Sequence, residues 1–119
     1  MPNVTEGSEE QLQVSFPASP TFTRIGRVAV AGLALRLGVD VSKVEQLRLA
    51  VDAAVDALNG DGRISVSAWW RADELLIELS NPEVEISDRS ELADKLASMV
   101  EKVTVESDQV ALHLATDAA

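Results

Sequence analysis

The sequence predicts an α+β fold: a two-layer sandwich whose mostly antiparallel sheet carries helices on one face. The first observation behind this is the order of predicted elements: strand, helix, helix, strand, strand, helix, strand, strand. The second is that successive strands are separated by short turns, which indicate hairpins and therefore antiparallel pairing. The chain has 119 residues, of which 46% are hydrophobic, and neither a repeat nor a linker. These properties are typical of a single domain.

The strands are predicted from alternation of apolar and polar residues. Residues 11–17 read QLQVSFP, in which every second side chain is apolar and Pro17 ends the run. Residues 64–70 place Ile64, Val66, Ala68 and Trp70 on one face. The other strands are expected at residues 74–80, 103–107 and 109–116.

The first helix is predicted at residues 21–38, after a turn at 18–23. Gly38 is expected to cap its C-terminus, while Gly26 and Gly32 weaken the helix and are expected to allow close packing. Apolar residues at helical spacing are expected to face the core: Ile25, Val28, Ala29, Leu33 and Leu37.

Two further helices are predicted at residues 40–60 and 91–102. Ser42 and Glu45 have the spacing of a capping box at the start of the first of these, and Ser90 is a candidate N-cap for the second. The apolar positions expected in the core are Val44, Leu47, Val51, Ala54, Val55 and Leu58 in the former and Leu92, Leu96, Met99 and Val100 in the latter.

Composition excludes several classes of function. The net charge of −10 argues against binding to nucleic acid or to an anionic membrane surface, and is compatible with a basic protein partner. The chain has no cysteine, so it forms neither disulfides nor thiolate metal sites. No apolar run approaches the roughly 18 residues of a membrane span. Residues 1–10 are acidic and polar, unlike a signal peptide. We expect them to be disordered, residues 11–116 to form one domain, and the protein to be cytoplasmic.

Three parts of the chain carry a resemblance to a known family. A strand ending in Phe-Pro precedes a helix with Arg24 and Arg27 near its start. Residues 47–58 read LRLAVDAAVDAL, and residues 92–116 read LADKLASMVEKVTVESDQVALHLAT. Together, and most specifically in the LAVD of residues 49–52, they resemble the anti-sigma-factor serine kinases of bacteria, which belong to the GHKL (Bergerat-fold) ATPase superfamily.

The sequence departs from this family at the positions that carry its chemistry. In the family, a glutamate on the helix with the LAVD motif acts on water or on the substrate hydroxyl, and an asparagine four residues later holds magnesium. The matching residues here are Ala53 and Ala57, and neither can accept a proton or bind a metal. Asp52 and Asp56 are rotated from these positions by about 100° around the helix.

The glycines that the family uses to hold ATP are also missing. After the third strand, its Asp-x-Gly-x-Gly motif reads the adenine, and a glycine-rich lid then closes over the phosphates. Residues 79–87 here read LSNPEVEIS, with Ser80 and Asn81 at the end of the strand, and no glycine follows Arg63. We therefore expect a domain that has lost its ATP lid, with no catalytic residue, cofactor or metal.

Five residues are candidates for partner binding. Arg24, Arg27 and Arg36 lie on the first helix, which the resemblance implicates in dimer and sigma-factor contacts; the alternative is ordinary solvated arginines. Trp69 and Trp70 are adjacent in a strand and face opposite sides, so one is expected at an interface unless another segment covers it.

Two charged features have simpler interpretations. His113, the single histidine, is expected to be structural or solvent-facing. Arg48, Asp52 and Asp56 are spaced four residues apart and predict a surface salt-bridge ladder.

The predicted function is that of a non-catalytic regulatory module. It would sequester a sigma factor or an antagonist protein without ATP, either alone, as the homodimer that the resemblance implies, or as a pseudokinase-like subunit of an active relative. One alternative is an active ATP-dependent serine kinase in which Asp52 or Asp56 replaces the missing groups. The other is an α+β scaffold protein unrelated to this family.

Overall fold

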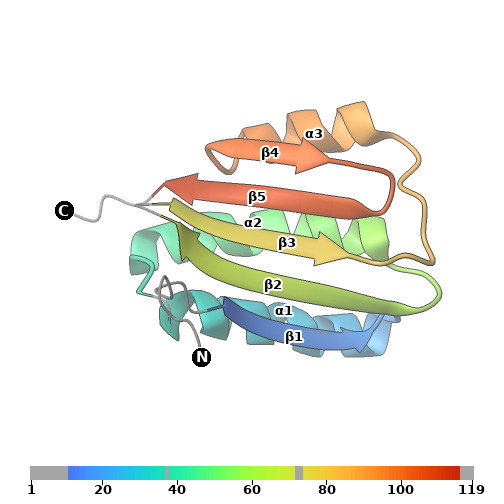
Figure 1. The fold of residues 1–119 in the computed structure, drawn as a ribbon, viewed down its shortest axis with the longest axis horizontal. Helices are drawn as coiled ribbons and strands as arrows, with labels where there is room; N and C mark the ends of the chain where they lie inside the picture. The colour runs from blue at the N-terminus through green and yellow to red at the C-terminus, as the bar shows by residue number, and fades with distance from the viewer. Residues whose placement is uncertain (1–10, 37, 72–73, 116–119) are drawn as a thin grey trace, which may run out of the picture.

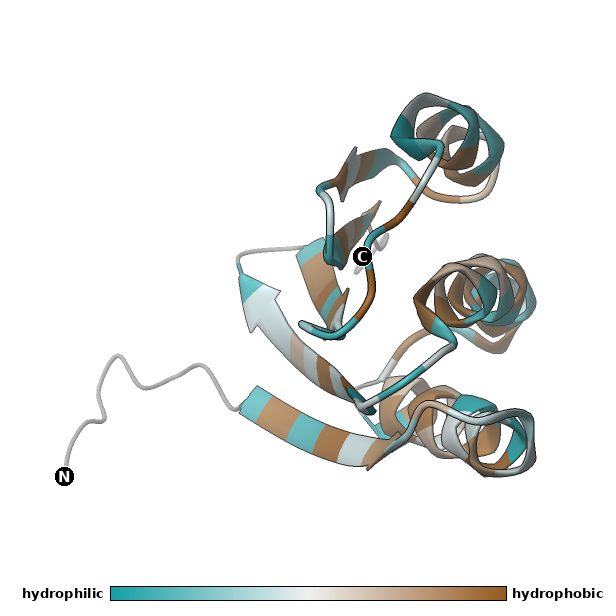
Figure 2. Cartoon of the chain, turned by 90° about the vertical axis from the view of Figure 1, so that its right-hand side faces the viewer, coloured by the Kyte–Doolittle hydropathy of each residue, from teal (hydrophilic) through white to brown (hydrophobic). Residues whose placement is uncertain are grey.

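A computed structural model of the chain describes residues 11–36, 38–71 and 74–115 (Figure 1). Its elements follow the predicted order and are β1 (Gln11–Pro17), α1 (Pro20–Arg36), α2 (Val41–Leu58), β2 (Arg63–Arg71), β3 (Glu74–Ser80), α3 (Arg89–Ala97), β4 (Lys102–Val105) and β5 (Gln109–Ala115). The strands form one sheet in the order β1-β2-β3-β5-β4, and every neighbouring pair is antiparallel. Figure 2 shows the three helices on the same side of the sheet, which confirms the predicted α+β sandwich.

Strand register places the predicted apolar faces toward the helices. The β2–β3 hairpin pairs Arg71 with Glu74, and the closing β4–β5 hairpin pairs Val105 with Val110. Ile64, Val66 and Ala68 of β2 are buried, as predicted from their alternation. Trp70 continues this face and is partly buried against the core.

The core between sheet and helices consists mainly of aliphatic side chains. Leu47 and Leu58 of α2, Ile77 and Leu79 of β3, and Leu112 of β5 are among the largest that are fully buried. Complete burial of such a side chain stabilises the fold by about 1.5–3 kcal/mol. The helix α2 contacts the middle of the sheet, at β3 and β5 (Figure 1).

The predicted core-facing side of α1 is wrong. Ile25 and Val28 are exposed, whereas the buried residues of the helix are Thr23, Gly26, Val30 and Ala34. The helix lies very close to β1 at Gly26. A Cβ atom at this position would be only 2.3 Å from the ring of Phe16. Only a side made of small residues allows that approach, so the larger side chains face outward. Of the other predicted positions, Ala29 and Leu33 are half-buried, and Leu37 lies outside the described residues.

The ends of α1 agree with the prediction only in part. Gly38 has φ +90°, and its N–H bonds the Leu35 carbonyl at 3.0 Å while the Val39 N–H bonds the Ala34 carbonyl at 3.1 Å. This is a Schellman motif, so the predicted C-cap is confirmed. The predicted turn at 18–23 is wrong from Pro20 onward, because proline is well suited to the first helical position. Nothing lies within 4 Å of a Cβ placed on Gly32, so that glycine does not serve close packing.

The predicted N-caps of the other two helices are wrong. The Asp40 carboxylate accepts a hydrogen bond from the Ser42 backbone N–H at 3.2 Å, and that of Asp88 accepts one from the Glu91 N–H at 3.0 Å. Ser42 and Ser90 therefore lie inside the first turns of α2 and α3. In each case an aspartate two residues earlier takes the cap position, where its charge also complements the helix dipole. The third helix ends at Ala97, earlier than predicted, although Val100 beyond it is still buried.

Candidate functional site

A hollow of about 450 Å³ lies between the end of α2, the segment after β3, and α3. Here the resemblance would place a nucleotide, because the helix that bears Ala53 and Ala57 meets the segment that replaces the Asp-x-Gly-x-Gly motif. The residues that line it are Ala57, Asn59, Val84, Glu85, Ile86, Ser87, Asp88, Glu91, Leu92 and Lys95.

The walls of this hollow carry the wrong charge for a triphosphate. Three carboxylates, those of Glu85, Asp88 and Glu91, face one cation, Lys95. A helix N-terminus is normally a good place for a phosphate, because its backbone N–H groups lack partners. At α3 the carboxylate of Asp88 already accepts one of these N–H groups, and Glu91 adds a second negative charge in the same turn. Both features disfavour an anionic ligand.

The two alanines at the family's catalytic positions lie differently. Ala53 is 8% exposed and packs in the core, and it is not part of the wall of the hollow. Ala57 is half-buried and does line it. Asn59, directly after α2, also lines the hollow, and its Oδ1 atom is buried without a hydrogen-bond partner among the described residues.

Asn81 has a structural role. It directly follows β3, where the family has its Asp-x-Gly-x-Gly motif. It is fully buried. Its Nδ2 group donates to the carbonyl oxygens of Leu58 at 2.9 Å and Asp61 at 2.8 Å, and its Oδ1 accepts from the Glu83 N–H at 3.0 Å. The side chain thus ties β3 to the C-terminal end of α2 and has no donor left for a ligand.

This role of Asn81 was not predicted from the sequence. The available signal was a polar residue directly after a buried strand, opposite the glycine-containing turn at residues 59–62. Gly62 has φ +83°, and a Cβ atom there would lie 2.9 Å from the Asn81 Oδ1. The glycine therefore gives the amide room to enter the turn.

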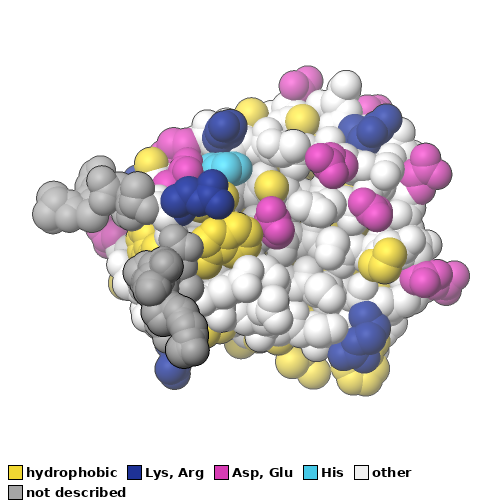
Figure 3. All heavy atoms as spheres, viewed as in Figure 1, with side chains coloured by type: hydrophobic (Ala, Val, Ile, Leu, Met, Phe, Trp, Pro, Cys, Tyr) yellow, Lys and Arg dark blue, Asp and Glu magenta, His cyan; other side chains and the backbone are white. Residues whose placement is uncertain are grey.

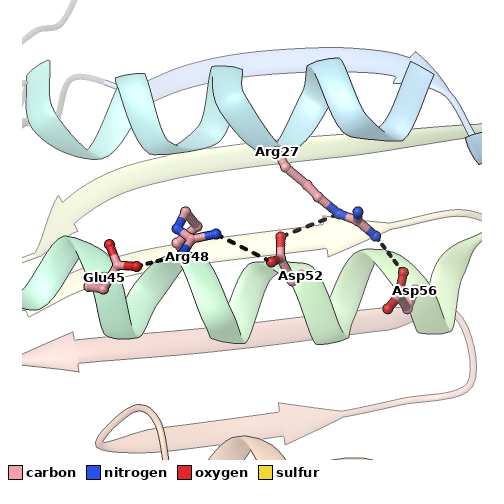
Figure 4. A network of polar contacts seen from close by, with 5 residues as sticks. All are labelled: Arg27, Glu45, Arg48, Asp52 and Asp56. Atoms are coloured by element: carbon pink, nitrogen blue, oxygen red, sulfur yellow. Dashed lines mark hydrogen bonds and ion pairs between the residues drawn. The ribbon is translucent and has the colours of Figure 1, made fainter. Parts of the chain in front are cut away.

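Arg48, Asp52 and Asp56 lie on the side of α2 toward α1 (Figure 4), and none of them lines the hollow. Arg27 of α1 approaches Asp52 with its Nε atom 3.3 Å from Oδ1, and it also forms an ion pair with Asp56. Arg48 pairs with Asp52 at 3.8 Å and with Glu45. The predicted ladder on α2 is thus confirmed for Arg48 and Asp52, and Arg27 connects it to the neighbouring helix. Partly exposed pairs of this kind contribute about 0.2–1 kcal/mol each.

The electrostatic effect of the ladder is clearest at its outer end. The hydrogen bond and the charge of Arg48 lower the pKa of the Glu45 carboxyl below its usual value of 4.5. The same carboxylate raises the pKa of Arg48. Neither Asp52 nor Asp56 lines the hollow, so both are poorly placed to replace the missing catalytic groups.

The candidate partner residues lie on two separate surfaces. Arg24 and Arg36 are exposed on α1, whereas Arg27 is half-buried in its ion pairs. Trp69 is half-buried and belongs to the sheet face opposite the helices, while Trp70 faces the core. A role in partner binding stays a prediction for all five.

The uncovered face of the sheet carries an apolar patch beside the single histidine (Figure 3). His113 is half-buried, as a structural role requires, with Nδ1 3.4 Å from the Glu74 Oε1. In residues 11–36, 38–71 and 74–115, no three histidine, aspartate or glutamate side chains are grouped so that they could hold a metal ion. No helix in these ranges is long and apolar enough to cross a membrane.

Comparison with known proteins supports the family relationship. The chain is 30% identical to the serine-protein kinase RsbW of Listeria monocytogenes over 79 residues, which cover 60% of this chain and 50% of the relative. It is 29% identical to RsbW of Listeria innocua over the same length. The chain therefore spans about half the length of these curated relatives. No protein-family model matches it. These similarities support a relationship to RsbW-like proteins, in agreement with the GHKL-like arrangement of sheet and helices.

Proposed function

We propose that this chain is a non-catalytic regulatory module, related to anti-sigma-factor serine kinases, that binds a protein partner without ATP. The chemistry of the hollow carries the proposal. Where a kinase of this family needs a general base, a magnesium ligand and a phosphate cradle, the chain has Ala53 packed in the core, with Ala57 and three carboxylates lining the hollow. Such a site lacks the groups that phosphoryl transfer requires.

The mechanism we propose is competition for a surface. A sigma factor, or an antagonist protein of the kind that kinases of this family phosphorylate, binds the domain, and one partner excludes the other. The domain acts alone, as a homodimer, or as a pseudokinase-like subunit beside an active relative. Each arrangement regulates through occupancy and needs no nucleotide.

An active kinase with unorthodox residues fits the geometry less well. It would need Asp52 or Asp56 to act at the nucleotide, but both carboxylates are paired with Arg27. The similarity to RsbW also disfavours a scaffold unrelated to the family.

Complex formation tests this proposal. The purified chain is mixed with each sigma factor and candidate antagonist encoded in the same genome, and the mixtures are analysed by size-exclusion chromatography with and without MgATP. We expect a complex that forms equally well in both conditions, and no transfer of labelled γ-phosphate to any partner. A complex that requires MgATP, or a phosphorylated antagonist, would overturn the proposal.

A further inference from the structure

The hollow that is unsuited to a triphosphate is well suited to a positive charge. Glu85 and Glu91 are exposed at its wall, and neither carboxylate forms an ion pair or a hydrogen bond in the described part of the chain. With Asp88 as the third carboxylate and Lys95 as the single ammonium group, the wall has a net charge of −2. A cleft lined mainly by charges of one sign concentrates ligands of the opposite sign.

One buried acceptor in the wall also lacks a donor. The Oδ1 atom of Asn59 is buried and has no hydrogen-bond partner among the described residues. Leaving such a group unpaired costs free energy. Because Asn59 lines the hollow, a donor that reached this atom from the hollow would remove that cost. A cationic side chain supplies both the charge that the carboxylates attract and the N–H donors that the amide oxygen lacks.

A bare metal ion is not the cation that this wall suits. In the described ranges of the chain, no three acidic or histidine side chains form a group that could hold one. The carboxylates instead share the wall with the apolar side chains of Val84, Ile86 and Leu92. Long basic side chains lay their aliphatic stem on apolar surface and keep the charged head at polar groups. Arginine adds a planar head that can bond a carboxylate through two parallel N–H groups.

The backbone between β3 and α3 forms part of the same wall. Five consecutive residues, 84–88, line the hollow. Val84 is half-buried and Ile86 buried, whereas Glu85 and Ser87 are exposed, an alternation typical of an extended chain. The N–H groups of Glu85 and Ser87 have no hydrogen-bond partner among the described residues. Unpaired N–H groups along an extended segment are a place where a second extended segment can pair.

Hydrogen bonds hold this segment against the β4–β5 turn. The Ile86 N–H lies between the two unpaired groups in the sequence, and it bonds the Ser107 carbonyl at 2.6 Å. The Asn81 N–H bonds the Asp108 carbonyl at 3.0 Å. The wall is therefore ordered before a ligand arrives, which reduces the entropy lost on binding. Its volume of about 450 Å³ is also in the range of pockets that bind small groups.

We propose that the hollow binds an arginine side chain from an extended segment of a basic protein partner. The guanidinium lies among the carboxylates of Glu85, Asp88 and Glu91, the stem lies on Leu92, and the partner's backbone pairs with residues 84–87. This inference rests on the proposed partner-binding function without ATP, and it specifies where one partner docks and by what chemistry. A free polyamine is a poorer occupant, because it would leave the N–H groups of the wall unpaired.

Synthetic peptides provide the first test. The probe is a fluorescein-labelled peptide of sequence Thr-Val-Arg-Val-Thr-Gly with blocked ends, and its binding to the full chain is measured by fluorescence anisotropy. A matched peptide replaces arginine by citrulline, which has a similar shape and no charge. Spermidine and arginine blocked at both ends are tested as competitors, since both carry the charge without an extended backbone. We expect the arginine peptide to bind at least about tenfold more tightly than each of these three.

Substitutions in the chain provide the second test. Glu85→Gln and Glu91→Gln are each expected to weaken binding of the arginine peptide about tenfold. Asp94→Asn and Glu106→Gln are matched controls, because each removes an exposed carboxylate that does not line the hollow. The controls should weaken binding by no more than about twofold, since distant exposed charges are screened by salt. All four residues are exposed, so circular dichroism should show an unchanged fold.

Four results would overturn the inference. They are no binding of the arginine peptide at a millimolar concentration of the chain, equal binding of the arginine and citrulline peptides, equal losses in the hollow and control variants, and spermidine or blocked arginine binding as tightly as the peptide. The last would identify a site for a small cation. Each of these results leaves the proposed function intact, because a partner can still form an ATP-independent complex through another surface. Phosphorylation of an antagonist would overturn that function whatever the peptides do.

Discussion

The two sides of α2 have opposite chemistry. The side toward α1 carries Arg48, Asp52 and Asp56, all of them in ion pairs. The other side carries only methyl groups at the corresponding positions: Ala53 packs in the core, and Ala57 lines the hollow. Each aspartate directly precedes one of these alanines in the sequence, so a rotation of about 100° separates the charged side from the side where the family's chemistry would lie.

This difference indicates what the charges of α2 do. Through their pairs with Arg27, Asp52 and Asp56 join two helices of the outer layer, where partial exposure makes ion pairs inexpensive to form. The inner side, where an unpaired carboxylate would be costly, is apolar. On that side, Ala53 and Ala57 supply neither a proton acceptor nor a metal ligand.

The largest effect is expected for Asn81→Asp, which places a carboxylate directly after β3, where the resemblance locates the aspartate of the family motif. A carboxylate would face the carbonyl oxygens of Leu58 and Asp61 and lose both donors. We expect the free energy of unfolding to fall by about 3–5 kcal/mol, measured by urea denaturation. Glu83→Gln, which keeps the backbone N–H bond to Asn81, is the control. A stable Asn81→Asp variant that binds MgATP would show that the position still serves a nucleotide.

A smaller effect is expected for Ala53→Glu, the catalytic residue of the family. Ala53 packs in the core, so a carboxylate there is desolvated without a partner and should cost about 2–3 kcal/mol of stability. Ala57→Glu, at the rim of the hollow, is expected to change stability by no more than about 0.5 kcal/mol. Equal melting temperatures for the two variants would contradict the asymmetry between these positions.

On the charged side of α2, Arg27→Met is expected to cost about 1 kcal/mol. The substitution keeps the aliphatic stem but removes the pairs with Asp52 and Asp56. Because these pairs are partly exposed, the loss should shrink in 1 M salt, where the Debye length is about 3 Å. Arg36→Met, an exposed arginine on the same helix, is the control. A loss that does not depend on salt would indicate that packing of the stem, and not charge, holds the helices together.

The smallest effect concerns pH. The hydrogen bond and charge of Arg48 lower the pKa of Glu45 in the folded chain. Glu45 therefore adds stability above its unfolded pKa, near 4.5, and this contribution is lost as the pH falls through the lower folded pKa. Carboxyl ¹³C NMR titration should show Glu45 ionised below its usual range, and Arg48→Gln should return it to normal. An ordinary titration in the unsubstituted chain would mean that the pair does not persist in solution.

Local patterns in the sequence predicted the strands well, because alternation in 64–70 directly reflects one buried face. They could not select the buried side of α1, since both sides are apolar and the choice depends on the approach of Gly26 to Phe16. The predicted N-caps were wrong for a local reason, because Asp40 and Asp88 compete with the nearby serines.

The site was predictable where it depends on residue identity and unpredictable where it depends on distant contacts. Ala57 lies at the hollow, as its place in the family pattern suggests. By contrast, the Asn81 amide donates to carbonyl groups 23 and 20 positions away, and Arg27 pairs with Asp56 across 29 positions. No pattern within one helix or strand contains such contacts.

Calorimetric titration of the purified chain with MgATP and MgADP tests the central claim most directly. We predict no heat of binding, and no shift in melting temperature at millimolar nucleotide. Binding in the micromolar range would contradict the account, because it would mean that Ala53, Ala57 and the acidic hollow have not removed nucleotide recognition from this fold.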